Sequence, residues 1–95
     1  MSNQTELQRY LGEIVDPIDA DATIRYSSTP QIDYFDVVAP NLGDGERYAI
    51  QQLGNAWADQ RGYVATVRVG ATITDVKRSP EHHKNFPIPD PLRIR

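Results

Sequence analysis

The stretch that decides the fold comprises residues 44–76 and reads DGERYAIQQLGNAWADQRGYVATVRVGATITDV. Its first half predicts a helix over residues 44–61, because Asp44 is a favourable N-cap residue and Glu46 places an acid in the first turn. Glycine readily adopts the left-handed conformation that ends helices, so Gly62 is the expected stop. Apolar residues at helical spacing define the expected buried side of this helix: Ala49, Ile50, Leu53, Ala56 and Trp57.

The second half of this stretch predicts one long strand over residues 63–77. Apolar residues occupy every second position: Tyr63, Ala65, Val67, Val69, Ala71 and Ile73. A hairpin turning at Gly70 would move Ile73 to the opposite face, so we favour a continuous strand with a bend or bulge at that glycine. Gly54 lowers helix stability by about 1 kcal/mol relative to alanine, and we interpret it as the point where this strand approaches the helix closely.

The N-terminal part of the chain adds a helix and two strands. The helix is predicted over residues 4–15, capped near Asn3 and ended before Pro17. Its apolar face carries Leu7, Tyr10, Leu11 and Ile14. Strands are predicted over residues 22–26 and 32–39, with a turn of serine, threonine and proline between them, so the two should form a hairpin.

These elements predict a small single α+β domain with the order α-β-β-α-β. Its three-stranded sheet, antiparallel or mixed, is packed on two helices that lie on one face. The core is expected to contain a few large side chains: Phe35, Leu53, Trp57 and Ile73. We assign residues 1–77 to this domain and residues 78–95 to an extended, basic and proline-rich C-terminal arm.

The arm has its own composition. Residues 1–76 carry five arginines against eleven acids, a net charge of −6, whereas residues 77–95 carry five basic residues against two acids, a net charge of +3. Proline at positions 87, 89 and 91 fixes the backbone and removes amide donors, so an extended conformation is expected. The arm could dock on its own domain or on a neighbouring subunit, bind an aromatic-lined groove on a partner, or remain a frayed end.

The composition also narrows the chemistry and the location. The chain has no cysteine, which excludes disulfides, thiolate catalysis and cysteine zinc sites. The N-terminus is polar and no run of about 18 apolar residues occurs, so we expect a cytoplasmic protein without a membrane span. The acidic domain would be repelled by phosphates, so direct nucleic-acid binding is not expected.

None of the candidate catalytic or metal-binding groups has the spacing that such chemistry requires. His82 and His83 are adjacent and would point to opposite sides of an extended chain. The acidic loop of Asp16, Asp19 and Asp21 lacks the spacing of a calcium loop, and Asp33 and Asp36 should lie on opposite faces of one strand. The loop before the second helix carries acids and no lysine, which disfavours phosphate binding. We therefore expect no catalytic residue, no metal and no cofactor.

Two functions are compatible with these observations. The first is a non-catalytic protein-protein interaction module, such as an adaptor, inhibitor or assembly component, whose partner is another protein or a second copy of the chain. It would use a sheet face or edge together with the arm, and its expected contact residues are Lys77, Arg78, Phe86, Ile88, Leu92, Arg93 and Arg95. The alternative is a small ligand-binding protein or small enzyme with a pocket between sheet and helices, lined by Arg25, Tyr26, Tyr34 and Arg68.

Overall fold

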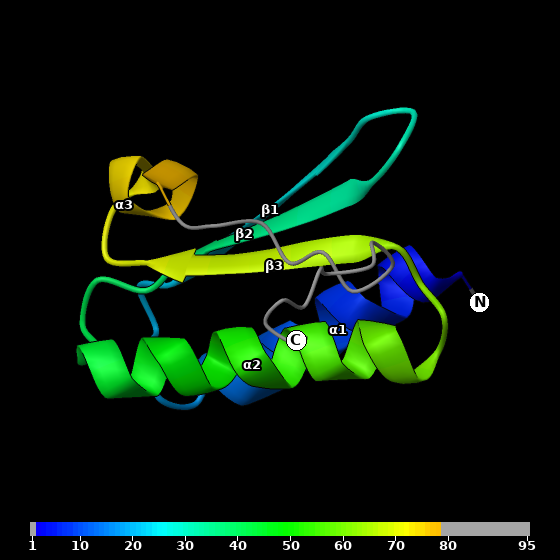
Figure 1. The fold of residues 1–95 in the computed structure, drawn as a ribbon. Coiled ribbons are helices and arrows are strands. Elements are labelled where there is room, and N and C mark those ends of the chain that lie inside the picture. The colour runs from blue at the N-terminus through cyan, green and yellow to red at the C-terminus, as the bar shows by residue number, and fades with distance from the viewer. Residues whose placement is uncertain (1, 79–95) are drawn as a thin grey trace, which may run out of the picture.

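The computed structural model describes residues 2–78 and shows three helices around a three-stranded sheet (Figure 1). The elements are α1 (Asn3–Val15), β1 (Thr23–Ser28), β2 (Asp33–Val38), α2 (Asp44–Gln60), β3 (Ala65–Gly70) and α3 (Ile73–Arg78). In the sheet, β2 is central and pairs antiparallel with β1 and parallel with β3. Figure 1 shows α1 and α2 on one face and α3 on the other. The predicted α+β class, the helix, strand, strand, helix, strand order and the mixed sheet are confirmed.

The N-cap residues of the two long helices lie one position earlier than predicted. The Ser2 hydroxyl, rather than Asn3, caps α1 by accepting the Thr5 N–H at 3.2 Å. At the start of α2, Gly43 is the cap residue and donates its N–H to the Glu46 carboxylate at 2.9 Å. Gly62 follows α2 with a φ of 65° and is the predicted left-handed stop.

The core lies between the sheet and the pair formed by α1 and α2. Its largest fully buried side chains on this side are Leu7, Leu11 and Val15 of α1, Phe35 and Val37 of β2, and Val67 of β3. Trp57 of α2 is 9% exposed and stacks on the Tyr10 ring at 6.0 Å. Phe35 and Trp57 are therefore core residues as predicted, and their burial contributes to the hydrophobic stabilisation of the fold.

The orientation of α2 differs from the one predicted. Leu53 is 47% exposed, and Ala49 and Ala56 are also exposed. Gly54 and Asn55 are buried instead, because this side of the helix faces β3. The apolar stripe was a misleading guide here, since a small and a polar residue make the closest contacts with the strand.

Gly54 is the point of closest approach between α2 and β3, as the sequence indicated. A Cβ atom at this position would lie 2.9 Å from Val67 Cγ2 and 3.1 Å from Leu11 Cδ2. Such distances are shorter than van der Waals contact, so only glycine fits without movement of the strand or of α1.

This close approach lets α2 side chains bond backbone groups of Val67 and Val69 at the outer edge of β3. Asn55 accepts the Val67 N–H at 2.9 Å and donates to the Val67 carbonyl at 3.2 Å. Gln51 accepts the Val69 N–H at 3.0 Å. An edge strand normally exposes such groups to further pairing. Here they are bonded within the domain.

The predicted continuous strand over residues 63–77 is wrong beyond Gly70. The chain leaves the sheet there and forms α3, whose first turn is closed by the Asp75 N–H donating to Thr72 Oγ1 at 3.2 Å. Val76 of α3 is fully buried, and a Cβ at Gly70 would lie 2.8 Å from the Val76 backbone nitrogen. The glycine therefore admits a helix against the sheet rather than bending a strand.

Two further expectations concern the C-terminal arm and membrane-spanning helices. Residues 79–95, which make up most of the predicted arm, lie outside the described residues. Among residues 2–78, no helix combines the length and the apolar composition that a membrane span needs.

Replacing Gly54 with alanine should destabilise the protein by about 1–3 kcal/mol through overpacking. The matched control is Gly12→Ala in α1, where the new Cβ would meet its nearest neighbour at 3.7 Å and the higher helix propensity should add roughly 0.5–1 kcal/mol. Chemical denaturation of both variants measures the difference. Equal stabilisation by the two substitutions would show that α2 and β3 are not in close contact.

Candidate functional site

A hollow of about 430 Å³ lies on the sheet face opposite α1 and α2, beside α3. It is lined by Arg25, Tyr26, Ser27, Ser28, Thr29, Tyr34, Asp36, Arg68, Ile73 and Lys77. All four residues that the sequence suggested for a ligand pocket, namely Arg25, Tyr26, Tyr34 and Arg68, line this one hollow. The covering helix is α3, which the sequence did not predict.

A row of alternating charge crosses the floor of the hollow. Strand register places Arg25 of β1 beside Asp36 of β2, and Asp36 beside Arg68 of β3. Arg68 donates from Nε to Asp36 Oδ1 at 2.8 Å and from Nη2 to Oδ2 at 2.9 Å. This two-point pairing is the geometry that fixes a guanidinium and a carboxylate most firmly. The Arg68 guanidinium also lies 4.8 Å from the centre of the Tyr34 ring.

Arg25, the first member of this row, differs from Arg68 in its pairing. Asp36 is turned toward Arg68, and no carboxylate of residues 2–78 forms an ion pair with Arg25. Its side chain is exposed, as is Lys77 on α3. Residues 2–78 carry seven basic and eleven acidic residues. Three of those seven bases line the hollow against one of the acids, so it is a cationic surface on an acidic domain.

Two hydroxyl groups beside the hollow, those of Ser28 and Tyr63, are bonded to Asp33. Ser28 Oγ donates to Asp33 Oδ1 at 2.6 Å, and the Tyr63 hydroxyl donates to Asp33 Oδ2 at 2.5 Å. Burial and the bond to Asp33 raise the pKa of Tyr63, so its proton stays in place at neutral pH. None of the described residues that line the hollow is a histidine, the usual base for a serine nucleophile.

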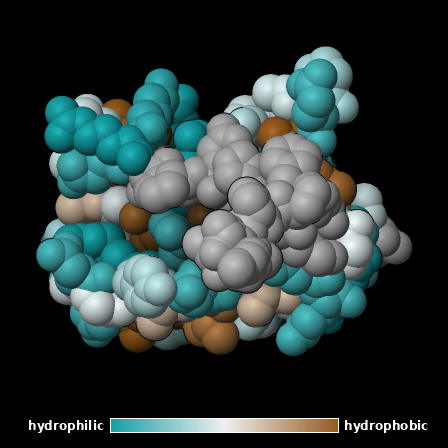
Figure 2. Space-filling model, in the orientation of Figure 1, coloured by the Kyte–Doolittle hydropathy of each residue, from teal (hydrophilic) through white to brown (hydrophobic). Residues whose placement is uncertain are grey.

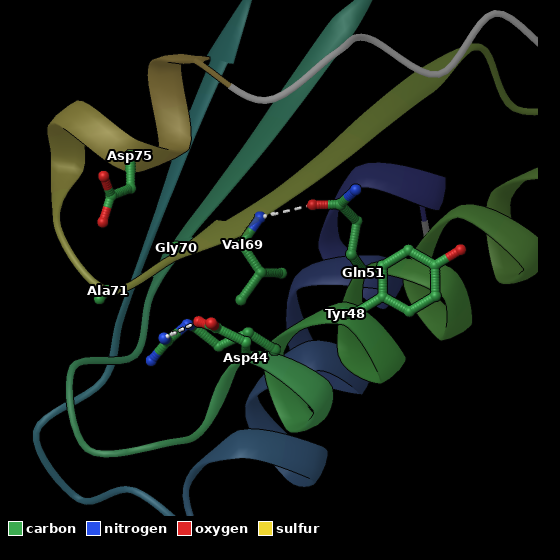
Figure 3. Close-up of a pocket in the computed structure, with 8 residues that line it drawn as sticks. Asp44, Tyr48, Gln51, Val69, Gly70, Ala71 and Asp75 are labelled. Atoms are coloured by element: carbon green, nitrogen blue, oxygen red, sulfur yellow. Dashed lines mark hydrogen bonds and ion pairs between the residues drawn. The ribbon is translucent and has the colours of Figure 1, made fainter.

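A second hollow of about 430 Å³ lies between the first half of α2, the end of β3 and α3. Figure 3 shows the Gln51 amide directed at the Val69 backbone and Asp75 on α3 above the gap. The remaining lining residues include Asp44, Arg47 and Tyr48. Arg47 donates to Asp44 at 2.6 Å and to the carbonyls of Ala39 and Leu42, so its charge fastens the loop before α2. The side chains of Asp44, Arg47 and Gln51 in this hollow therefore have structural roles.

The acidic loop after α1 is also structural. Asp19 is 3% exposed and accepts hydrogen bonds from the Asn41 backbone at 2.9 Å, the Asn41 side chain at 2.8 Å and the Asp21 N–H at 3.0 Å. Burial alone would raise the pKa of Asp19, but these hydrogen bonds together lower it. The carboxylate ties the loop before β1 to the loop before α2.

The other residues that the sequence suggested for contacts or metal binding lie on α3 or outside the described part of the chain. Lys77 and Arg78 are exposed on α3. Phe86, Ile88, Leu92, Arg93 and Arg95 lie outside the described residues, as do His82 and His83. In the described part of the chain, no three metal-binding side chains are grouped as a metal site requires.

Comparison of the chain with models of known protein families, with curated proteins and with solved structures finds no match.

Sequence reasoning missed two features of the site. Asp36 was considered only as a possible catalytic partner of Asp33, whereas strand register makes it the partner of Arg68. The helix α3 was also missed, although Thr72 and Asp75 have the spacing of a helix cap and first turn. That capping signal was the one available sign that the strand ends at Gly70.

Replacing Arg68 with methionine should lower the free energy of unfolding by roughly 2–3 kcal/mol, because Asp36 would remain largely buried without its partner. Both side chains are shielded, with 15% and 10% of their surfaces exposed. The double variant Asp36→Leu/Arg68→Met should recover most of this loss. Urea denaturation of the single and double variants gives the coupling, with Arg25→Met as the exposed control. Additive losses would contradict the pairing.

The stability of the domain should depend on the ionisation of Asp19. Because its folded-state pKa is lowered from 3.8, its contribution is present at neutral pH and is lost as the pH falls through the folded pKa. We expect Asp19→Asn to be less stable than the wild type at pH 7, and the difference to shrink in acid below about pH 4. Thermal melts across this range measure it, with exposed Glu13→Gln as control. A difference that is constant with pH would refute the assignment.

Proposed function

We propose that this protein is a non-catalytic protein-protein interaction module whose contact surface is the sheet face beside α3. The observation that carries the proposal is the unequal covering of the sheet. Two helices of 13 and 17 residues cover one face, whereas a single helix of six residues covers the other in the described part of the chain. The thinly covered face holds the hollow and its charged row.

The charges of this face favour an acidic partner. Arg25 and Lys77 are exposed here, on a domain that is otherwise rich in acids. Opposite charge on a partner would speed association and orient it, and the effect would weaken as salt rises. The partner can be another protein or a second copy of this acidic chain.

The exposed hydrophobic residues on the face that Figure 2 shows form only small separate patches, so they give less support to a contact surface elsewhere on the domain. Figure 2 shows hydrophilic residues over α3 and the hairpin tip, and hydrophobic residues in small separate patches, some of them over α2. The exposed apolar side chains among the described residues include Tyr48 and Leu53 on α2 and Ile18 in the loop after α1. In this proposal further contacts come from Lys77 and from the C-terminal arm, through Arg78, Phe86, Ile88, Leu92, Arg93 and Arg95.

Binding of a small anionic molecule is the second candidate function. It is favoured by one observation: Arg25, Tyr34 and Arg68 all line the same hollow. Its volume of about 430 Å³ is within the range of ligand pockets, roughly 300–1,000 Å³. A ligand there would contact two guanidinium groups and an aromatic ring, a combination suited to a planar carboxylate or a phosphate.

The test is affinity capture from the native host with three forms of the full chain. These are the wild type, the face variant Arg25→Glu/Lys77→Glu, and the control Arg9→Glu/Arg61→Glu, which makes the same charge change outside the hollow. A captured protein is then purified and its dissociation constant measured at low and moderate salt. The proposal expects a partner bound by the wild type and the control but at least about tenfold more weakly by the face variant.

A partner that binds the face variant as tightly as the wild type would contradict the proposed surface. A small anion that raises the melting temperature of the wild type by several degrees, and not that of the face variant, would favour the second candidate.

A further inference from the structure

The two edges of the sheet differ in how their backbone groups are satisfied. At the outer edge of β3, the Val67 N–H and C=O are bonded to Asn55 and the Val69 N–H is bonded to Gln51. At the outer edge of β1, no strand of the described chain pairs with it. Every residue of β1 except Ile24 is exposed. Proteins usually protect such edges, so the contrast identifies β1 as an open one.

The register shows which β1 groups face outward. Asp33 and Ala39 of β2 donate to carbonyls at positions 64 and 70, so the odd-numbered residues of β2 face β3 and the even-numbered ones face β1. Antiparallel pairing with these even-numbered residues directs the backbone groups of Thr23, Arg25 and Ser27 toward β2. The N–H and C=O groups of Ile24, Tyr26 and Ser28 therefore face away from the sheet.

Building on the proposed function, we propose that the partner contributes an extended acidic segment that adds to β1 as a fourth, antiparallel strand. Its backbone would exchange hydrogen bonds with Ile24 and Tyr26. The residue opposite Arg25 would then form a pair without backbone hydrogen bonds, in which side chains lie closest together. An acid at this position would extend the alternating row of Arg25, Asp36 and Arg68 by one member.

The neighbours of that acid on the incoming strand would face the other side of the sheet. They would lie beside Ile24, which packs against the core, and Tyr26, whose ring is 5.3 Å from the Phe35 ring and which is 41% exposed. Apolar residues are favoured there because they would cover the exposed part of the tyrosine. The recognised pattern is thus apolar, acidic, apolar.

A second copy of β1 does not meet this requirement. The strand TIRYSS contains no acid, so pairing β1 with β1 would leave Arg25 without an opposite charge. This is the reason for choosing an acidic segment of a different sequence as the occupant.

The test is an NMR titration of the full-length, ¹⁵N-labelled protein with synthetic peptides. The probe is acetyl-Ser-Thr-Val-Glu-Val-Thr-Ser-amide, and the charge control carries lysine in place of glutamate. In one further peptide both valines are N-methylated, which removes the donors that would face β1. In its matched control the glutamate is N-methylated, at an amide that would face away. The protein variants are Arg25→Glu and the exposed control Arg9→Glu.

The proposal expects the glutamate peptide to shift the amide signals of Ile24, Tyr26 and Ser28 and to bind about tenfold more tightly than the lysine peptide. Arg25→Glu should reverse this preference, and Arg9→Glu should not. Methylation of the valines should abolish binding, whereas methylation of the glutamate should not.

Equal binding of the two methylated peptides would overturn strand addition. Unchanged charge preference in Arg25→Glu would overturn the assigned pairing, as would a β1-to-β1 dimer found by sedimentation with these amides at its interface. If the glutamate peptide shifts only Tyr34, Asp36 and Lys77, the strand proposal fails while the sheet face remains the contact surface of the proposed function.

Discussion

The packing of α2 against β3 is the interaction on which the rest of the structure depends. It requires glycine at position 54, because any side chain there would collide with Val67 and Leu11. Close approach brings Asn55 and Gln51 within hydrogen-bonding distance of the outer backbone groups of β3. One contact therefore buries the core side of the strand and satisfies its edge. A polar side chain buried in this way stabilises the fold because each of its groups has a partner.

The bonding of α2 along the outer edge of β3 limits where the described domain can make further contacts. With α1 and α2 on one face and α2 bonded along one edge, the parts of the sheet that residues 2–78 leave accessible are the face beside α3 and the edge of β1. Both meet at Arg25, the exposed end of the charged row that includes Asp36 and Arg68. Asp36 and Arg68 are held in place by their ion pair, whereas the exposed Arg25 can pair with an acid of a partner. Fold and proposed contact surface follow from the same strand order.

Periodicity predicted most of the architecture but not its closest contacts. The helical spacing of α1, the two strands of the hairpin and the stop at Gly62 followed from local sequence because local chemistry determines them. Leu53 was predicted to be buried but is exposed. The side of a helix that faces the sheet depends on which residues pack there, and in α2 the residue that packs against β3 is Gly54. The strand was extended past Gly70 because alternation over a few residues cannot be told from a short helix, and the cap at Thr72 was the stronger signal. The pocket was expected between the sheet and the two long helices, whereas the hollow that Arg25, Tyr26, Tyr34 and Arg68 line is on the opposite face, beside α3. The partner of Arg68 depended on register, which spacing alone does not provide.

Hydrogen exchange of backbone amides in the full-length protein tests the central claim most directly. If α2 seals β3 and leaves β1 open, the amides of Val67 and Val69 exchange only on global unfolding, while those of Ile24, Tyr26 and Ser28 exchange rapidly in the native state. The account predicts this difference within a single sheet. Rapid exchange at Val67 and Val69, or slow exchange at the three outward-facing amides of β1, would contradict it.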